Sequence, residues 1–177
     1  MNDMSMPNAY GSLIEPTTLQ IQRLLPGPIE RVWSYLTQSD LRRQWLASGD
    51  MEEKAGAAFE LTWRNDELSK LPSQRPDGFG KEHSMKSKVL VCEPPHKLVY
   101  TWGENGSVTF ELKPTGKKVL LTLTHRRLDE RGSRLMVGAG WHAHLDTLAD
   151  RLEAREPGPF WDRWTALRAE YDTRLPG

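Results

Sequence analysis

The segment SRLMVGAGWHAHLDTLADRLEAR, residues 133–155, decides the fold of this chain. Its large apolar side chains recur at offsets of four, three and four residues, at Trp141, Leu145, Leu148 and Leu152. At about 100° per residue this spacing places them on one face of an α-helix. Gly138 projects onto the same face and would let a neighbouring sheet or a ligand approach closely. We therefore expect a long helix that covers a sheet, with a cavity between the two.

Upstream of this helix, apolar and polar residues alternate with the period of two that is typical of β-strands. The alternation predicts strands over 18–25, 59–63, 81–92, 96–102, 108–112 and 119–125. Short turns, such as Pro114-Thr115-Gly116, separate the later strands, which indicates an antiparallel meander. Residues 65–80 are expected to form a loop with a turn at Asp77-Gly78.

Two short helices are expected between the first two strands. One covers 30–37, with Pro28 at or near its first turn, and the other covers 41–46 and carries Trp45. Ser39 or Asp40 is the expected cap of the second helix. With the helices segregated against an antiparallel sheet, the fold class is α+β.

The chain beyond residue 155 continues with Pro157-Gly158-Pro159 and a second helical stripe that is rich in aromatic residues. The stripe consists of Phe160, Trp161, Trp164, Leu167, Tyr171 and Leu175. It either packs back on the domain or forms a homodimer interface. We therefore divide the chain into a flexible leader at 1–17, a ligand-binding domain at 18–155 and a C-terminal helical extension at 156–177.

Composition excludes several classes of function. The 177 residues carry 24 Lys and Arg against 24 Asp and Glu, and this zero net charge argues against a nucleic-acid-binding protein. The short basic clusters are interpreted as solvated surface; they are Arg42-Arg43, Lys86/Lys88, Lys117-Lys118 and Arg126-Arg127. No window approaches the ~20 apolar residues of a membrane span, and no secretory signal is visible, so a cytoplasmic location is expected.

The sequence predicts neither a metal site nor a cofactor. Cys92 is the single cysteine, so no intrachain disulfide can form, and it is interpreted as an inert thiol. His142 and His144 lie ~200° apart around a helix, so one ion could not easily bind both. No phosphate loop, zinc signature or Ser/His/Asp spacing is present.

The order of motifs resembles a known superfamily. The motifs lie at 28–33, 36–37, 41–45, 94–102 and 121–125, followed by Gly140-Trp141 with Leu145 and Leu148. Over 18–155 this order is similar to the START-like (SRPBCC) superfamily, which has the helix-grip fold of the birch-pollen allergen. Within it, the chain resembles the branch named after the activator of heat-shock protein 90 ATPase.

The resemblance implies a seven-stranded curved sheet that grips the long helix around a hydrophobic pocket. Since six strands are predicted, the seventh is expected at 50–54 or from a split of 81–92. Members of the superfamily include ligand carriers, cyclase- and aromatase-like enzymes and co-chaperones. Genuine chaperone activators also carry a separate N-terminal domain, and residues 1–17 are too few to hold it.

Strand parity, the apolar face of the long helix and Trp45 of the second short helix give the residues that are expected to line the pocket. They are Trp45, Phe59, Leu61, Trp63, Met85, Tyr100, Trp102, Phe110, Leu121, Leu123, Trp141, Leu145 and Leu148. Such an apolar and aromatic lining is typical of small-molecule pockets. The alternative is a packed core without a cavity.

A few polar residues share the inward parity. Arg23 either pairs with a ligand carboxylate or is carried to solvent by strand twist. His83 and His125 are either polar anchors or histidines with partners at the sheet end. His142 and Asp146, at i and i+4, form either an oriented base or a surface hydrogen bond.

Three functions follow as hypotheses. The first is a non-catalytic protein that holds a small hydrophobic ligand under the long helix. The second is an enzyme of the polyketide cyclase or aromatase type, in which one His or Arg moves a proton. The third is a co-chaperone that activates the heat-shock protein 90 ATPase.

Overall fold

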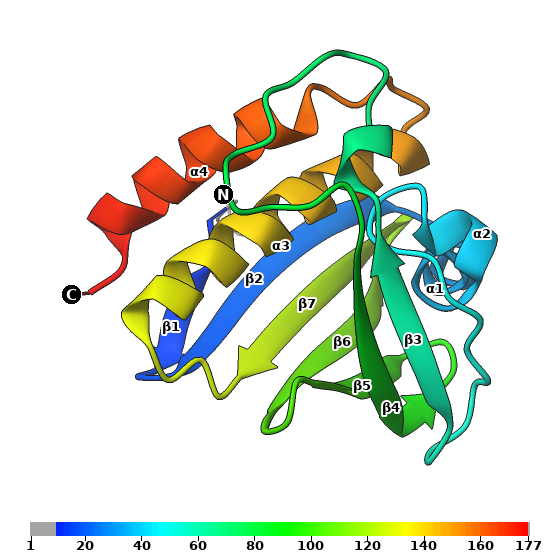
Figure 1. The fold of residues 1–177 in the computed structure, drawn as a ribbon. Coiled ribbons are helices and arrows are strands. Elements are labelled where there is room, and N and C mark those ends of the chain that lie inside the picture. Colours follow the sequence, from blue (N-terminus) through cyan, green and yellow to red (C-terminus); the bar gives the residue numbers. More distant parts are fainter. Residues whose placement is uncertain (1–9, 177) are drawn as a thin grey trace.

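A computed structural model describes residues 10–176 and shows a curved, seven-stranded antiparallel sheet around a long helix (Figure 1). The strands are β1 (Ser12–Glu15), β2 (Thr18–Pro26), β3 (Ala58–Trp63), β4 (His83–Glu93), β5 (Lys97–Trp102), β6 (Gly106–Thr115) and β7 (Lys118–Arg126). Their spatial order is β1-β2-β7-β6-β5-β4-β3, so β1 and β3 are the two edges. The expected α+β fold with an antiparallel meander is confirmed.

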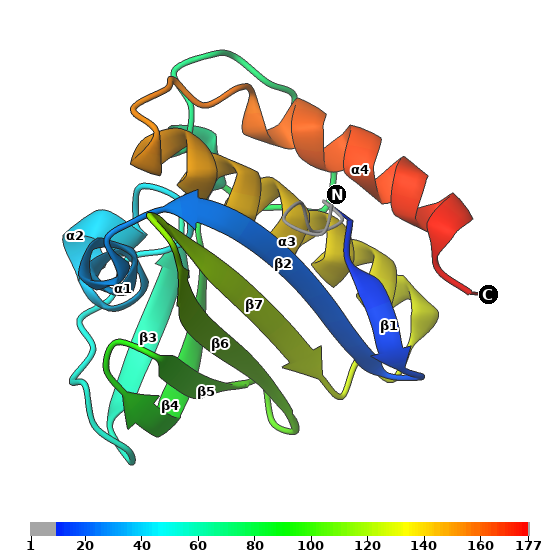
Figure 2. The same ribbon diagram turned by 180° about the vertical axis from the view of Figure 1, so that it is seen from behind.

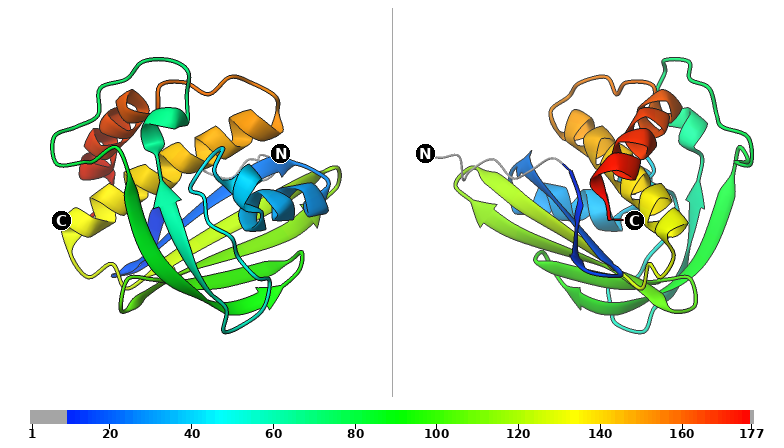
Figure 3. Two further views of the ribbon diagram at one scale, coloured as in Figure 1. Left: turned by 45° about the vertical axis from the view of Figure 1, so that its right-hand side comes forward. Right: turned by 90° about the vertical axis from the view of Figure 1, so that its left-hand side faces the viewer.

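The helices occupy three places around the sheet. Helices α1 (Ile29–Thr37) and α2 (Ser39–Arg42) follow the end of β2, and a 3₁₀ helix, η2 (Asn65–Glu67), follows β3 (Figure 2). Helix α3 (Arg131–Leu152) lies across the concave side of the sheet, and α4 (Phe160–Arg174) packs on the side of α3 that is turned away from the sheet (Figure 3). None of the helices in the described part of the chain is long and apolar enough to cross a membrane.

The seventh strand is β1, which lies in the segment expected to be a flexible leader. It pairs with β2, with Leu13 opposite Leu19. Residues 50–54 contain no strand and β4 is continuous, so both positions suggested for the seventh strand were wrong. Four residues at an exposed edge are too few to show a clear alternation, which explains why the sequence pattern missed them. Residues 1–9 of the leader lie outside the described residues.

The inward faces of the strands and one face of α3 form the main core. Trp141, Leu145, Leu148 and Leu152 all belong to it, so the apolar spacing within residues 133–155 marks the sheet-facing side of α3. Paired positions such as Phe110 opposite Leu123 bring large side chains together on adjacent strands.

Helix α3 is apolar on a second face as well. A separate cluster joins Leu135, Ala139 and Ala143 of α3 to the aromatic stripe of α4. A Cβ atom on Gly138 would lie 3.6 Å from the Tyr171 ring, so Gly138 faces α4 and is not part of the sheet-facing side. The aromatic stripe is therefore buried within one chain, which is the docked alternative of the two that the sequence left open.

Arg42 departs most from its predicted place. The second helix spans Ser39–Arg42 instead of 41–46, with Gln38 at its N-cap, and Arg42 is completely buried, not solvated. Its guanidinium donates to the carbonyl oxygens of Leu36, Thr37, Ala47 and Gly49. Because the planar guanidinium group donates to several acceptors at once, it can be buried at a position that the sequence pattern assigns to the solvent-exposed surface.

Candidate ligand-binding cavity

A cavity of about 430 Å³ lies between the β3–β4 edge of the sheet, α3, the start of α4 and the loop between η2 and β4. Its lining comprises Leu46, Trp63, Asn65, Gly78, Phe79, Gly80, Lys81, Glu82, His83, Met85, Trp102, Met136, Val137, Gly140, Trp141, His144, Phe160, Trp161 and Trp164. The polar residues at 81–83 are exposed and form the mouth. The cavity thus lies to one side of the sheet–helix interface and not at its centre.

Aromatic rings form both walls of the cavity. On the sheet side, the ring centroid of Trp102 lies 5.5 Å from that of Trp63 and 5.2 Å from that of Trp141. On the helix side, the ring of Phe79 lies 5.0 Å from Trp161 and 5.2 Å from Trp164. Rings at these separations and tilted angles stabilise one another, so the walls are built before any ligand is present.

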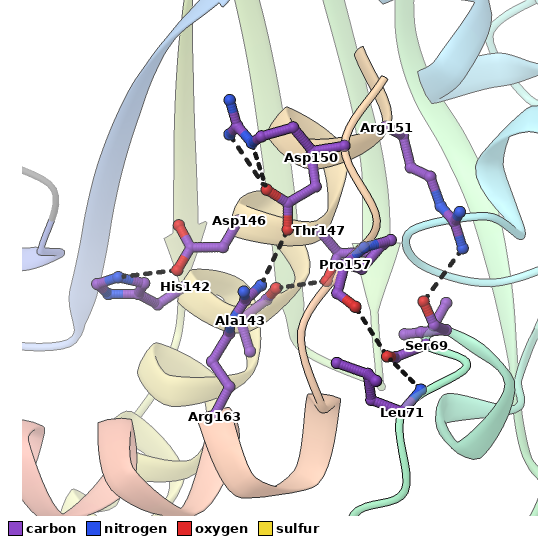
Figure 4. A network of polar contacts seen from close by, with 12 residues as sticks. Ser69, Leu71, His142, Ala143, Asp146, Thr147, Asp150, Arg151, Pro157 and Arg163 are labelled. Atoms are coloured by element: carbon purple, nitrogen blue, oxygen red, sulfur yellow. Dashed lines mark hydrogen bonds and ion pairs between the residues drawn. The ribbon is translucent and has the colours of Figure 1, made fainter. Parts of the chain in front are cut away.

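Polar contacts fasten the helix-side wall to α3 (Figure 4). The Asp150 carboxylate of α3 lies 3.4 Å from Nη1 of Arg163 in α4 and 3.1 Å from Nη2 of Arg155. The hydroxyl of Ser69 donates to the Pro157 carbonyl over 2.8 Å and accepts from the backbone N–H of Leu71 over 3.0 Å (Figure 4). The η2–β4 loop and α4 are therefore held as one wall.

His144 is the buried histidine of the cavity. Its ring lies 4.8 Å from the ring of Phe160, and its Nδ1 lies 2.8 Å from the backbone oxygen of Trp45. A carbonyl oxygen only accepts, so Nδ1 carries the proton and Nε2 of the neutral ring keeps its lone pair. Burial away from water lowers the pKa of His144 to about 4. The ring is therefore neutral near pH 7 and presents an acceptor, not a positive charge.

The structure brings only part of the predicted pocket lining to this cavity. Trp63, Met85, Trp102 and Trp141 line it. The other predicted residues pack in the main core: Trp45, Phe59, Leu61, Tyr100, Phe110, Leu121, Leu123, Leu145 and Leu148. Because side chains from the curved sheet and α3 interdigitate at the centre, the space that remains is displaced towards the β3–β4 edge.

The three predicted polar anchors lie in three different environments. His83 lines the mouth of the cavity with its ring 5.6 Å from that of Trp63. His125 is buried outside the cavity lining, and its Nδ1 accepts a 2.9 Å hydrogen bond from the indole N–H of Trp141. It is therefore a histidine with a partner in the protein, which is the second of the two expected alternatives. Arg23 is neither at a ligand site nor in solvent, because it is buried and lies 3.0 Å from Asp146.

His142 belongs to a buried polar network that lies outside the cavity. Its Nε2 is 3.5 Å from the Asp146 carboxylate, and its Nδ1 is 2.9 Å from the hydroxyl of Tyr171. That hydroxyl also accepts the backbone N–H of Gly11 over 2.7 Å. The expected surface hydrogen bond is thus a buried link between α3, α4 and the segment before β1. Burial lowers the pKa of His142 to about 4 and raises that of Tyr171 to about 12.

Sequence reasoning missed the helix-side wall. Phe160, Trp161 and Trp164 were recognised as a buried stripe, but not as part of a ligand site. The i, i+4 pair of Gly140 and His144 was the available signal, since it places a gap and an acceptor on one face of α3. Phe79 gave no signal, because a loop has no periodicity that fixes where its side chains point.

The curved sheet wrapped around one long helix defines this molecule as a helix-grip protein. The chain belongs to the family described as activator of Hsp90 ATPase homolog 1-like protein, within the SRPBCC superfamily, and the family model matches residues 26–153. Helix α4 lies beyond the matched segment.

Solved structures with the same fold support this assignment. A protein of Bordetella parapertussis, solved by NMR in solution, is 37% identical with a TM-score of 0.79, over 100% of this chain and 97% of that chain. CalU16 from Micromonospora echinospora is 24% identical with a TM-score of 0.65, over 89% and 86%. DynU16, from the dynemicin biosynthetic locus, is 19% identical with a TM-score of 0.64, over 81% and 49%. The last two similarities show the fold alone. No curated protein matches the chain.

Proposed function

We propose that this protein binds a small, largely apolar aromatic ligand in the cavity between the β3–β4 edge, α3 and α4. The observation that carries the proposal is the cavity itself, with about 430 Å³ of space between two aromatic walls. Small-molecule sites are typically concave, largely apolar and already formed, with few polar groups to orient the ligand. His144 is such a group, and the exposed residues at 81–83 leave a polar mouth.

Binding without catalysis is favoured over a cyclase or aromatase activity. A general base works best when its pKa lies near the working pH, whereas burial holds the pKa of His144 at about 4. The Nδ1 of His144 also faces a backbone carbonyl, not a carboxylate that would stabilise the protonated ring. We accordingly assign His144 a role in binding.

The proposal needs one copy of the chain and a small-molecule partner. The aromatic stripe that could have served a homodimer is buried against α3. Cys92 is a free thiol, which fits a reducing compartment such as the cytoplasm.

Gly140→Leu is expected to block the cavity. A Cβ atom on Gly140 would contact only the indole nitrogen of Trp164, at 4.0 Å. The backbone therefore accommodates a leucine, whose side chain would extend into the cavity. The dissociation constant of the neutral fluorescent probe N-phenyl-1-naphthylamine should rise at least tenfold in a fluorescence titration. Native mass spectrometry with organic extraction should find a co-purifying small molecule in the parent protein and little in this variant.

Gly132→Leu is the matched control, because Gly132 lies on the same helix with nothing near its Cβ position and outside the cavity lining. It should bind the probe as the parent protein does. Equal binding by both variants, or a parent protein that neither carries a ligand nor binds any member of an aromatic library, would contradict the proposed function.

A further inference from the structure

One ring nitrogen of His144 has no hydrogen-bond partner among residues 10–176. Nδ1 is fixed by the Trp45 carbonyl, so Nε2 is the acceptor of the neutral ring. Within residues 10–176, no N–H or O–H group donates to this Nε2. The side chain is 7% exposed and lines the cavity. Nε2 is not one of the fully buried atoms that lack a partner, so it is open to the cavity, and a ligand that covers it must offer a donor in place of water.

The surroundings of this acceptor restrict what can reach it. The His144 ring lies 4.8 Å from Phe160 and 6.4 Å from Trp141 by ring centroids, so both neighbours are flat and apolar. Gly140, one turn earlier on α3, leaves space next to the ring. A planar ligand can therefore lie between the aromatic walls with one edge at Nε2.

We propose that Nε2 of His144 accepts a hydrogen bond from a hydroxyl group of the ligand, so that the cavity selects neutral hydroxylated aromatic compounds. This inference rests on the proposed function and names the ligand class of the same site. A ligand without the hydroxyl would cover Nε2 without replacing the hydrogen bond to water, which makes the loss of affinity larger than for an exposed contact. An anionic ligand gains no affinity from His144, because the neutral imidazole offers a lone pair and no positive charge.

The test compares 1-naphthol with 1-methoxynaphthalene, which share the ring system and differ in the hydroxyl proton. By isothermal titration calorimetry, the full chain should bind 1-naphthol about tenfold more tightly. His144→Asn keeps an N–H near the position of Nδ1 for the Trp45 carbonyl but has no acceptor that reaches the place of Nε2. This variant should bind 1-naphthol about tenfold more weakly than the parent protein does, and its affinity for 1-methoxynaphthalene should be unchanged.

His96→Asn is the matched control, because Nδ1 of His96 also lies near a backbone carbonyl, that of Leu112 at 3.3 Å, while the residue lies outside the cavity lining. It should bind both compounds as the parent does. In the parent protein, the ¹⁵N resonance of His144 Nε2 should move upfield with 1-naphthol and stay in place with 1-methoxynaphthalene, which decides the question even if His144→Asn does not fold.

The outcomes separate the two proposals. Equal affinity for both compounds and an unmoved Nε2 resonance would overturn the role of His144 while leaving the cavity as the binding site. Binding of neither compound by the parent protein, together with no effect of Gly140→Leu, would overturn the proposed function itself.

Discussion

Lowering the pH from 8 to 5 should reduce the free energy of unfolding by about 6 kcal/mol, from roughly 2 kcal/mol at each of three buried histidines. Burial holds the pKa values of His125, His142 and His144 at about 4, below the ordinary 6.5. Between these values the unfolded chain takes up protons that the folded protein does not. The stabilisation is therefore present above pH 6.5 and is lost as the pH falls towards 4.

Desolvation lowers the pKa of all three histidines, but their hydrogen-bond partners differ. His125 accepts from Trp141, and His144 donates to the Trp45 carbonyl. At His142, the nearby Asp146 carboxylate favours the charged ring, yet desolvation remains the larger effect. Each ring is thus buried neutral, and placing a charge on it in the folded protein costs desolvation energy that the unfolded chain does not pay.

Urea unfolding at a series of pH values from 8 to 5 measures this loss. His144→Asn removes one of the three groups and should reduce the pH-dependent change by about a third. An NMR titration of the parent should show three histidine side chains that stay neutral down to pH 5. A change in the free energy of unfolding below about 2 kcal/mol over this range would contradict the burial of neutral rings.

Arg42→Met should destabilise the protein by about 3–5 kcal/mol. The guanidinium is fully buried and donates to four backbone carbonyls in the α1–α2 region and the loop that follows. Methionine matches its length but donates nothing, so those carbonyls would remain buried without partners. Arg42→Lys should recover little of this loss, because an ammonium group cannot reproduce the planar fork.

The neighbouring Arg43 provides the control for this prediction. Its side chain is 52% exposed and lies 3.8 Å from the exposed Glu67 carboxylate, so Arg43→Met should change stability by less than about 1 kcal/mol. Chemical unfolding of the three variants beside the parent gives the comparison. Equal losses for Arg42→Met and Arg43→Met would rule out the structural role assigned to Arg42.

The sequence predicts the scaffold well because the scaffold depends on periodic patterns. Alternation located six of the strands, and the spacing of Trp141, Leu145 and Leu148 located the sheet-facing side of α3. Patterns of this kind report which face of an element is buried. They do not report whether two buried faces meet without a gap, so Tyr100 and Leu145 were assigned to a pocket that their own packing fills.

The rest of the site depends on contacts that have no local signature. Phe79 reaches the cavity because hydrogen bonds such as that from Ser69 to Pro157 hold its loop against α4. Arg42 was interpreted as solvated surface, although its acceptors lie only five to seven residues away along the chain. Arg23 was expected to face inward, but its partner Asp146 lies 123 residues away. Burial of a polar group is decided by the partners that the folded backbone brings to it, which a single sequence does not display.

The segment that defines the family ends at residue 153, before α4 begins at Phe160. Three residues of the cavity wall, Phe160, Trp161 and Trp164, therefore lie outside the matched segment and outside the main core. Substitutions at these three positions would therefore change the cavity wall without changing the sheet or the sheet-facing side of α3. Under the proposed function, α4 would be one place where proteins that share this scaffold differ in the ligand they prefer.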